Sequence, residues 1–418
     1  MPSPTADVVI VGGGLAGMSC ARHLQDIGVP YRLIEASDRI GGRVKTDRVD
    51  GFLLDRGFQV LQTAYPVVRR TLMNYPLRLK RFPPGVVIHR DNRLYTLADP
   101  RRCPKYLWET MTAPVGTLTD RLRMVKMARN VCSGTDESLF QSPESTAMVF
   151  LKASGFSEKM IRSFFIPFFG GVCLDPQIRA SSRVLQYVFR MFARGDAALP
   201  ENGMEEIPRQ ISCAIPAERI LTGIRVDRVA EGKVVLEDGR EWQPRAVVLA
   251  TEGPEVQRLL GRSDPIGSVS ETCLYFSTNQ LPIKEPFLVL NGDGKGPVNN
   301  VAFPSMVSPG YAPPGQHLVS VVVLGLPPGD AAGMESRVRA QLGQWFGPMV
   351  RRWRHLKTYL IRHALPQQFP PTSDPTVPQP PVGPGIFVCG EYGSLPGIQW
   401  AMLSGRRSAE TVINYLKH

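Results

Sequence analysis

The stretch DVVIVGGGLAG at residues 7–17 decides how the chain begins to fold. The apolar, β-branched run at residues 8–11 is typical of a buried parallel strand, and the glycines behind it end that strand. Apolar residues recur at helical spacing from Met18 to Ile27, which predicts a helix, and residues 31–35 form a second apolar run. Because strand–helix–strand crossovers are right-handed, the two strands are expected to be parallel neighbours.

The glycines of this loop have the GxGxxG spacing of a dinucleotide-binding turn. Gly12 permits the tight turn, Gly14 lets the backbone approach a pyrophosphate, and Gly17 allows the helix to pack closely on the strand. The first turn of the helix, with Leu15 and Ala16, offers unpaired N–H groups to the phosphates. The spacing is meaningful because it lies between a strand and a helix, but it does not distinguish FAD from NAD.

Glu35 ends the second predicted strand, where a carboxylate accepts hydrogen bonds from ribose hydroxyls. Such a carboxylate would repel a 2′-phosphate, so NADP is not expected here. Glu35 also begins the stretch EASDRIGGR at residues 35–43, which resembles the ExxxRxGGR motif of the flavin-dependent amine oxidase, protoporphyrinogen oxidase and phytoene desaturase superfamily. The resemblance implies FAD, and FAD is expected to be non-covalent because no cysteine stands in an attachment context.

Four further stretches resemble the same superfamily. Residues 247–251 (VVLAT) match the strand that closes the FAD domain, and residues 387–391 (FVCGE) with 397–405 (GIQWAMLSG) match the C-terminal flavin motif. Residues 55–60 (DRGFQV) resemble the segment that passes the flavin ring, and residues 203–208 (GMEEIP) resemble the segment that leads back to the FAD domain. The presence of all these motifs in one chain is more specific for the superfamily than any single motif.

Several of these residues have a physical reason to contact FAD. Gly41 and Gly42 let the backbone pass close to the cofactor, and Arg43 presents a fork of donors to phosphate oxygens. Glu391 is expected to accept ribityl hydroxyls, and the helix predicted from Ile398 points its positive N-terminus at the flavin N1–C2=O edge. No catalytic residue and no metal ligand is predicted. The full set of predicted FAD contacts is Gly12, Gly14, Leu15, Ala16, Gly17, Glu35, Ala36, Arg39, Gly41, Gly42, Arg43, Gly57, Phe58, Gln59, Val226, Thr251, Gly390, Glu391, Gly397, Ile398, Gln399 and Ala401.

Segments with an alternating strand and helix pattern occur at the start, in the middle and at the end of the chain. The segments between them have different sequence patterns. We therefore predict an α/β fold whose Rossmann-type FAD-binding domain is assembled from residues 1–75, 203–262 and 380–418. Residues 76–202 and 263–379 are predicted to form an α+β substrate-binding domain with an antiparallel sheet and helices.

Local signals predict parts of the second domain. Residues 86–90 and 93–97 read as a hairpin that turns at Asp91-Asn92. Residues 100–212 are mostly helical in pattern, and the proline-rich residues 366–384 read as an extended connector.

Two features bear on the reaction. The apolar segment FFIPFFGGV at residues 164–172 resembles a substrate-domain segment of porphyrinogen-oxidase-like and desaturase-like members. Amine oxidases of the superfamily usually carry a lysine near flavin N5, where this sequence has Glu271-Thr272-Cys273. The leading hypothesis is an FAD-dependent oxidase, dehydrogenase or desaturase that removes hydride from a largely apolar substrate, such as a polyene or a porphyrinogen. The alternatives are an amine or amino-acid oxidase on the same fold and a non-catalytic flavin-binding partner.

The sequence contains one dinucleotide fingerprint. The glycines at residues 292–296 lie among predicted strands with no helix behind them, so they read as a turn. A dedicated NAD(P)H site is therefore not expected. Oxygen or a quinone is the predicted electron acceptor.

The amino-acid composition limits the classes of protein to which the chain can belong. Of 418 residues, 43% are hydrophobic and 21% are charged, which allows a large core and excludes a disordered or collagen-like chain. The net charge of +12 is interpreted mainly as solvated surface, with association at a membrane surface as the other interpretation; no nucleic-acid motif is present.

The cysteines and the start of the chain bear on location. Seven scattered cysteines without a CxxC pair indicate reduced thiols. No apolar run is long enough to span a bilayer, and the first residues show no charged leader. We expect a cytoplasmic protein, either free or peripheral at a membrane.

Overall fold

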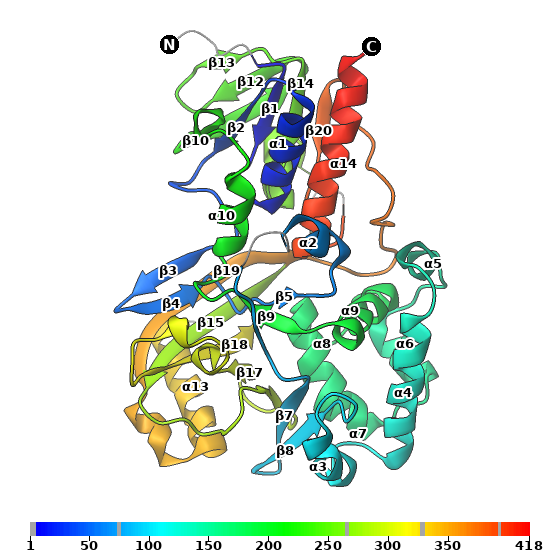
Figure 1. Cartoon of the computed structure of the whole chain (residues 1–418), viewed down its shortest axis with the longest axis vertical. Coiled ribbons are helices and arrows are strands. Elements are labelled where there is room, and N and C mark those ends of the chain that lie inside the picture. Colours follow the sequence, from blue (N-terminus) through cyan, green and yellow to red (C-terminus); the bar gives the residue numbers. More distant parts are fainter. Residues whose placement is uncertain (1–5, 73–76, 264–266, 327–330, 392–393) are drawn as a thin grey trace.

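The predicted strand–helix–strand unit forms the centre of a five-stranded parallel sheet (Figure 1). The strand order is β10-β2-β1-β14-β20, and every neighbouring pair is parallel. The strands are β1 (Val8–Val11), β2 (Tyr31–Glu35), β10 (Ile220–Thr222), β14 (Ala246–Leu249) and β20 (Ile386–Val388). Segments from the start, the middle and the end of the chain thus build one sheet, which confirms the predicted Rossmann-type fold.

The computed structural model describes residues 6–72, 77–263, 267–326, 331–391 and 394–418. The predicted domain boundary at residues 75–76 and the first residues, 1–5, on which the expectation of no leader rests, lie outside the described residues. The domain boundaries stay predictions.

The two faces of the parallel sheet follow the alternation of side chains along its strands. Val8 and Ile10 pack into a core with α1 (Leu15–Ile27) and α14 (Ile398–Leu416). Val9 and Val11 pack on the opposite face, against a small antiparallel sheet. Its strands are β11 (Val226–Ala230), β12 (Lys233–Leu236) and β13 (Glu241–Trp242).

Helices α1 and α14 cross at very short range (Figure 1). A Cβ atom on Gly405 would lie 2.0 Å from the carbonyl oxygen of Ala16. Only glycine permits this approach, which fixes α14 against the first turn of α1.

A seven-stranded sheet forms the other half of the molecule, in the order β19-β15-β18-β17-β16-β7-β8 (Figure 1). Its strands are β7 (Gly85–Arg90), β8 (Arg93–Ala98), β15 (Ser268–Thr278), β16 (Leu288–Asn291), β17 (Val298–Ala302), β18 (His317–Leu324) and β19 (Arg354–Pro366). The predicted hairpin is confirmed as β7–β8, with positive φ angles of 49° and 55° at Asp91 and Asn92. The sheet is antiparallel except where β7 and β16 pair in parallel, so it is more mixed than predicted.

Strand β19 has no counterpart among the sequence predictions. It carries Arg354, His355, Lys357 and Arg362 and is mostly half-buried or exposed, so it lacks the apolar run that marked the other strands. Its place is set by pairing along β15. Residues 367–385, which follow it, contain no helix or strand, in agreement with the predicted connector.

The chain between β8 and β9 (Ala197–Leu199) is mostly helical, as predicted. The helices are α3 (Leu107–Thr112), α4 (Leu118–Cys132), α5 (Asp136–Phe140), α6 (Ala147–Ala153), α7 (Glu158–Met160), α8 (Ile166–Cys173) and α9 (Ser182–Arg194), with a π-helical turn at Ile161–Phe165. Arg190 of α9 is buried and donates to Asp136 Oδ1 (2.6 Å) and to the carbonyl oxygen of Val131. This arginine ties α9 to α5 and to the last turn of α4.

The remaining elements connect the two halves or cover their sheets. Helix α13 (Ala331–Phe346) packs Val338 and Leu342 onto the seven-stranded sheet. The shorter elements are β3 (Thr46–Val49), β4 (Phe52–Asp55), β5 (Leu61–Gln62), β6 (Lys80–Arg81), α2 (Pro66–Thr71), α10 (Glu206–Ser212), α11 (Gly253–Leu259) and α12 (Pro304–Val307). Strands β3 and β4 form a hairpin, and β9 joins β5 to β6.

In the part of the chain that the structure describes, no helix combines the length and the apolar character needed to cross a membrane. All seven cysteines are free thiols.

Candidate cofactor and substrate site

The glycine loop after β1 is held by contacts that exclude side chains. Gly12 has a φ of 110°, and a Cβ atom there would lie 2.7 Å from the carbonyl oxygen of Ala250. A Cβ atom on Gly17 would lie 1.9 Å from the carbonyl oxygen of Gly12. Both positions therefore have the roles predicted for them, a tight turn and close helix packing.

Gly14 differs from these two because the space beside it is open. It caps α1 without a side-chain hydrogen bond, and a Cβ atom there would meet nothing nearer than the Cα atom of Gly42, at 3.9 Å. The loop containing Gly41 and Gly42 thus faces the start of α1 through glycines alone. Because the N–H groups of the first helical turn have no partner within the helix, this opening suits the pyrophosphate of a dinucleotide.

Glu35 lies at the end of β2, as predicted, and is tied to the same loop. Its Oε2 atom accepts from the N–H of Gly13 (2.7 Å), and its Oε1 atom accepts from the N–H (2.9 Å) and hydroxyl (2.6 Å) of Ser37. Ala36 lies between them in the turn that follows β2. These contacts orient the carboxylate and leave it lone pairs for a ribose.

Arg43 joins the N-terminal and C-terminal motifs. Its Nη2 atom lies 2.5 Å from Glu391 Oε2, and its Nη1 atom donates to the carbonyl oxygen of Ala364 (2.5 Å). Gly390 is also close to the start of α1, since a Cβ atom there would lie 3.4 Å from the Cβ atom of Ala16. Residues separated by almost the whole chain therefore meet at one place.

Arg39 has partners within the protein. It donates to Asp47 Oδ1 (2.9 Å) and to Glu205 Oε1 (3.1 Å), and the other Glu205 oxygen accepts from the N–H of Thr46. Glu205 belongs to the predicted GMEEIP stretch. These contacts fix the 35–43 stretch to β3, and the contact of Arg39 with FAD stays a prediction.

The segment at residues 55–60 runs between β4 and the seven-stranded sheet. Gly57 has a φ of 94°, and a Cβ atom there would lie 2.8 Å from Ile361 Cδ1. The amide of Gln59 donates to the carbonyl oxygens of Arg43 (2.9 Å) and Arg56 (3.0 Å), so it links this segment to the 35–43 stretch.

Asp55 at the end of β4 is fully buried. It accepts from the hydroxyl groups of Thr46 (2.5 Å) and Tyr311 (2.8 Å) and from the N–H of Met204 (3.0 Å). Burial raises the pKa of Asp55 to about 6, against the opposing effect of these three donors. This network fixes the segment that follows.

The N-terminus of α14 lies at the predicted flavin end of the site. Gly397 caps the helix with a φ of 115° and no side-chain hydrogen bond, and Ile398 begins it. Ala401 makes the first helical hydrogen bond, back to Gly397. The side chain of Gln399 is buried and accepts from the N–H of Val67 (2.9 Å), which ties α14 to α2.

Two predicted contacts lie on the β14 side of the sheet. The hydroxyl group of Thr251 is buried and has no hydrogen-bond partner among the described residues. Val226 is buried on β11, and its carbonyl oxygen accepts from Arg258 (2.9 Å). The orphaned Thr251 hydroxyl beside the Gly12 turn is what a bound polar group would satisfy.

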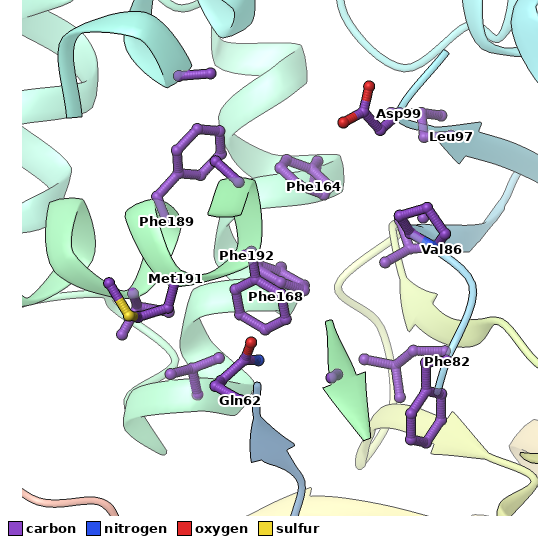
Figure 2. A pocket seen from close by; sticks show the side chains of 18 of the residues that line it. Gln62, Phe82, Val86, Leu97, Asp99, Phe164, Phe168, Phe189, Met191 and Phe192 are labelled. Carbon is purple, nitrogen blue, oxygen red and sulfur yellow. The ribbon is translucent and has the colours of Figure 1, made fainter. Parts of the chain in front are cut away.

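A cavity of about 890 Å³ is lined in large part by residues of the helices α3, α4, α8 and α9 (Figure 2). Phe58, Gly397 and Trp400 line it, so it reaches both the 55–60 segment and the start of α14. Figure 2 shows Phe164, Phe168 and Phe192 on the helical side, opposite Val86 and Phe82. The predicted apolar segment at 164–172 therefore supplies part of the wall.

Glu271 of β15 is the functional candidate that sequence reasoning did not place in the site. It lines the cavity, and its Oε1 atom accepts from the N–H of Phe58 (3.1 Å). Burial raises the pKa of Glu271 to about 7, with that hydrogen bond as the smaller, opposing effect. The available signal was the resemblance to amine oxidases, which implied a lysine near flavin N5 at residues 271–273.

Other polar groups on the cavity wall are few and partly unsatisfied. The side-chain Oε1 atom of Gln62 and the Tyr187 hydroxyl are buried without hydrogen-bond partners among the described residues, and both residues line the cavity. Such groups orient a ligand in an otherwise apolar pocket. No group of three or more His, Cys, Asp or Glu side chains in the described residues is arranged to hold a metal ion.

The start of α1 suits the pyrophosphate of a dinucleotide, and the start of α14 lies beside the cavity. One parallel sheet carries both helix ends, and this arrangement suits an FAD-dependent oxidoreductase. The chain belongs to the flavin containing amine oxidoreductase family, whose model matches residues 15–413. FAD is therefore its cofactor.

Curated relatives match a limited part of the chain. An L-amino-acid oxidase of Bungarus fasciatus is 35% identical over 109 residues, which are 26% of this chain and 20% of that protein. Polyamine oxidase 2 of Arabidopsis thaliana is 35% identical over 105 residues, 24% of this chain and 21% of that protein. The matched region thus spans about a fifth of these relatives.

Solved structures match along the whole chain. Cyclohexylamine oxidase from Brevibacterium oxydans IH-35A has a TM-score of 0.73 at 16% identity and covers 99% of this chain and 100% of its own. A putative protoporphyrinogen oxidase from Exiguobacterium sp. 255-15 also has a TM-score of 0.73 at 16% identity, with 100% of both chains covered. At these identities the likeness shows the fold.

Proposed function

We propose that the protein oxidises a largely apolar substrate, such as a polyene or a porphyrinogen, by removing a hydride. The observation that carries the proposal is the cavity, which connects the start of α14 and Phe58 to a wall of phenylalanines. When bound, FAD supplies the acceptor for the hydride. The apolar wall excludes water from the donor carbon and favours substrates with long hydrocarbon or ring surfaces.

Glu271 is the group that we expect to move a proton. Its Oε1 atom accepts from the N–H of Phe58, and Oε2 has no hydrogen bond of its own among the described residues that line the cavity. Removal of two hydrogens from adjacent atoms releases one hydride to the cofactor and one proton. With a pKa of about 7, Glu271 is matched to accept that proton at Oε2 near neutral pH.

A second candidate function is an amine or amino-acid oxidase. The names of the curated relatives favour it, and the Glu271 carboxylate would pair with a substrate ammonium group. Against it, the cavity carries far more apolar than polar surface, which suits a small cationic donor poorly. A third candidate, a flavin-binding partner without catalysis, predicts that no donor reduces the flavin.

The deciding experiment mixes the purified FAD-loaded protein anaerobically with polyenes, porphyrinogens, primary amines and amino acids, and follows bleaching of the flavin. We expect apolar donors to reduce the flavin faster than primary amines. A clear preference for a small amine or amino acid would select the second candidate. If dithionite-reduced flavin also failed to pass electrons to oxygen or a quinone, the third would stand.

The proposed electron acceptor is oxygen or a quinone, because the sequence has a single dinucleotide fingerprint. Anaerobic mixing with NADPH should leave the flavin spectrum unchanged. Rapid bleaching by NADPH would instead require a nicotinamide site in addition to the FAD site.

A further inference from the structure

Half of the large apolar side chains that are exposed among the described residues lie on α3 and α4, beside the cavity. Trp108, Leu118 and Leu122 have exposed fractions of 78%, 64% and 71%. We call the set to which they belong the mouth face. It consists of Leu107, Trp108 and Met111 on α3 and Leu118, Leu122 and Val125 on α4. The other large apolar side chains that are exposed among the described residues are scattered from Ile27 to Tyr415.

The mouth face on α4 is a stripe that points away from the protein core. At 100° per residue, Leu118, Leu122 and Val125 fall within about 60° of one another around the helix axis. The buried residues of α4, Asp120 and Met127 among them, lie on the opposite side. A surface helix normally turns its polar face outward, so an apolar stripe here indicates a partner that is itself apolar.

The two helices are held together as one surface. Arg121 of α4 donates to the carbonyl oxygens of Thr110 (3.1 Å), Ala113 (3.0 Å) and Val115 (2.6 Å), at the end of α3 and just beyond it. These contacts tie the start of α4 to the last turn of α3 and to the loop between the two helices. Hydrogen bonds therefore hold the segments that carry the exposed apolar residues in a fixed position relative to one another.

The mouth face is continuous with the cavity. Met111, Leu118, Leu122 and Val125 are exposed and also line the cavity, as does Arg129, one helical turn beyond Val125. A molecule that leaves an apolar phase at this face can enter the cavity without crossing bulk water.

Basic side chains border the apolar residues. Lys126 and Arg129 on α4 are exposed, and within the described part of the chain neither has an ion-pair partner. Lys105, next to α3, is paired with Glu285 (2.8 Å), and Glu109 is the exposed acidic residue of α3. An apolar centre with a tryptophan and unpaired cations at its edge matches an anionic lipid surface, whose headgroups attract the cations while the apolar side chains enter the interface.

We propose that the mouth face docks on the surface of an anionic bilayer and that the cavity takes its substrate from the lipid phase. The proposal deepens the proposed function, since it names the source of an apolar substrate for the same cavity. Trp108, Leu118 and Leu122 enter the interface, and Lys126 and Arg129 contact the headgroups.

Vesicle flotation of the FAD-loaded protein tests the docking without turnover. We expect wild type to float with phosphatidylcholine vesicles that contain about 30% phosphatidylserine, and to float less with pure phosphatidylcholine or at high salt. The double variant Trp108→Glu/Leu122→Glu should bind the anionic vesicles about tenfold more weakly or worse. The matched control is Val149→Glu/Leu360→Glu, which places the same two charges at exposed apolar sites on α6 and β19, outside the cavity lining.

Failure of wild type to bind either vesicle, or equal binding by wild type and the double variant, would overturn the proposal. So would a dimer in light scattering that the double variant dissociates, because the mouth face would then cover a second copy of the chain. Unchanged melting temperature and FAD content in the variants separate lost docking from lost folding. Flavin reduction by a donor dissolved in detergent is measured in parallel, so a failed oxidation and a failed docking give different results.

Discussion

At the scale of single residues, Glu271 joins the cavity wall to the segment at residues 57–58. Its carboxyl group is buried, and it stands in the stretch where the resemblance to amine oxidases led us to expect a lysine. Arg39, Gln59 and Gln399, which were predicted to contact FAD, have hydrogen-bond partners inside the protein. A motif predicts which residues gather around a site, but not which of them face the ligand, because neighbouring donors and acceptors compete for the same side chains.

The pH dependence of stability reports on Glu271. Because burial raises its pKa from 4.5 to about 7, the folded protein holds the proton more tightly than the unfolded chain does. Its favourable contribution is full below pH 4.5 and is lost as the pH rises to 7. Glu271→Gln, neutral throughout, should therefore gain up to about 3 kcal/mol of unfolding free energy relative to wild type across this range.

Urea unfolding of both proteins at pH 4.5 and at pH 7 measures this difference. The control is Glu231→Gln, at an exposed position of the loop after β11. Parallel profiles for wild type and Glu271→Gln would show that the carboxyl group is not buried as described.

FAD retention tests the open space beside Gly14. Gly14→Val should fold normally, because its Cβ atom has no neighbour closer than 3.9 Å and its φ of −76° suits any residue. The valine side chain would occupy the space assigned to the pyrophosphate, so FAD should bind about tenfold more weakly or worse. Fluorescence titration of the apoprotein measures this, with Gly343→Val, in open space on α13, as control. Equal FAD affinity in Gly14→Val would place the pyrophosphate elsewhere.

At the scale of elements, prediction from sequence worked where the signal is local. The β1–α1–β2 unit and the β7–β8 hairpin depend on glycine spacing, side-chain alternation and a two-residue turn, all within short windows. Strand β19 was not predicted because basic side chains interrupt its apolar residues and because its place is set by pairing with β15, far away in sequence. A single sequence carries little information about which distant strands pair with each other.

The attachment of α9 to its neighbours depends on Arg190. Removing its side chain leaves Asp136 without a partner and the carbonyl oxygens of Val131 and Ser133 without a donor. Arg190→Met should therefore lower the unfolding free energy by about 3–5 kcal/mol. Arg162→Met, which breaks an exposed pair with Glu158, should cost less than about 1 kcal/mol. Equal losses in the two variants, measured by denaturant unfolding, would contradict this account.

At the scale of the whole molecule, the cavity is the feature that no sequence window contains. Its wall combines Phe58, Phe164, Glu271 and Trp400, which come from both halves of the fold. The FAD motifs predicted the class of protein because each is a short local pattern. The substrate class depends instead on how the helices between β8 and β9 pack over the seven-stranded sheet.

We propose that this cavity holds the substrate, and filling it with a larger side chain tests that role. Val188 of α9 lines the cavity, whereas Val149 of α6 is exposed outside it. For the apolar donor that reduces wild type fastest, Val188→Trp should lower the rate of anaerobic flavin reduction about tenfold or more, with FAD content unchanged. Val149→Trp should react like wild type. Reduction of Val188→Trp at the wild-type rate would contradict the account.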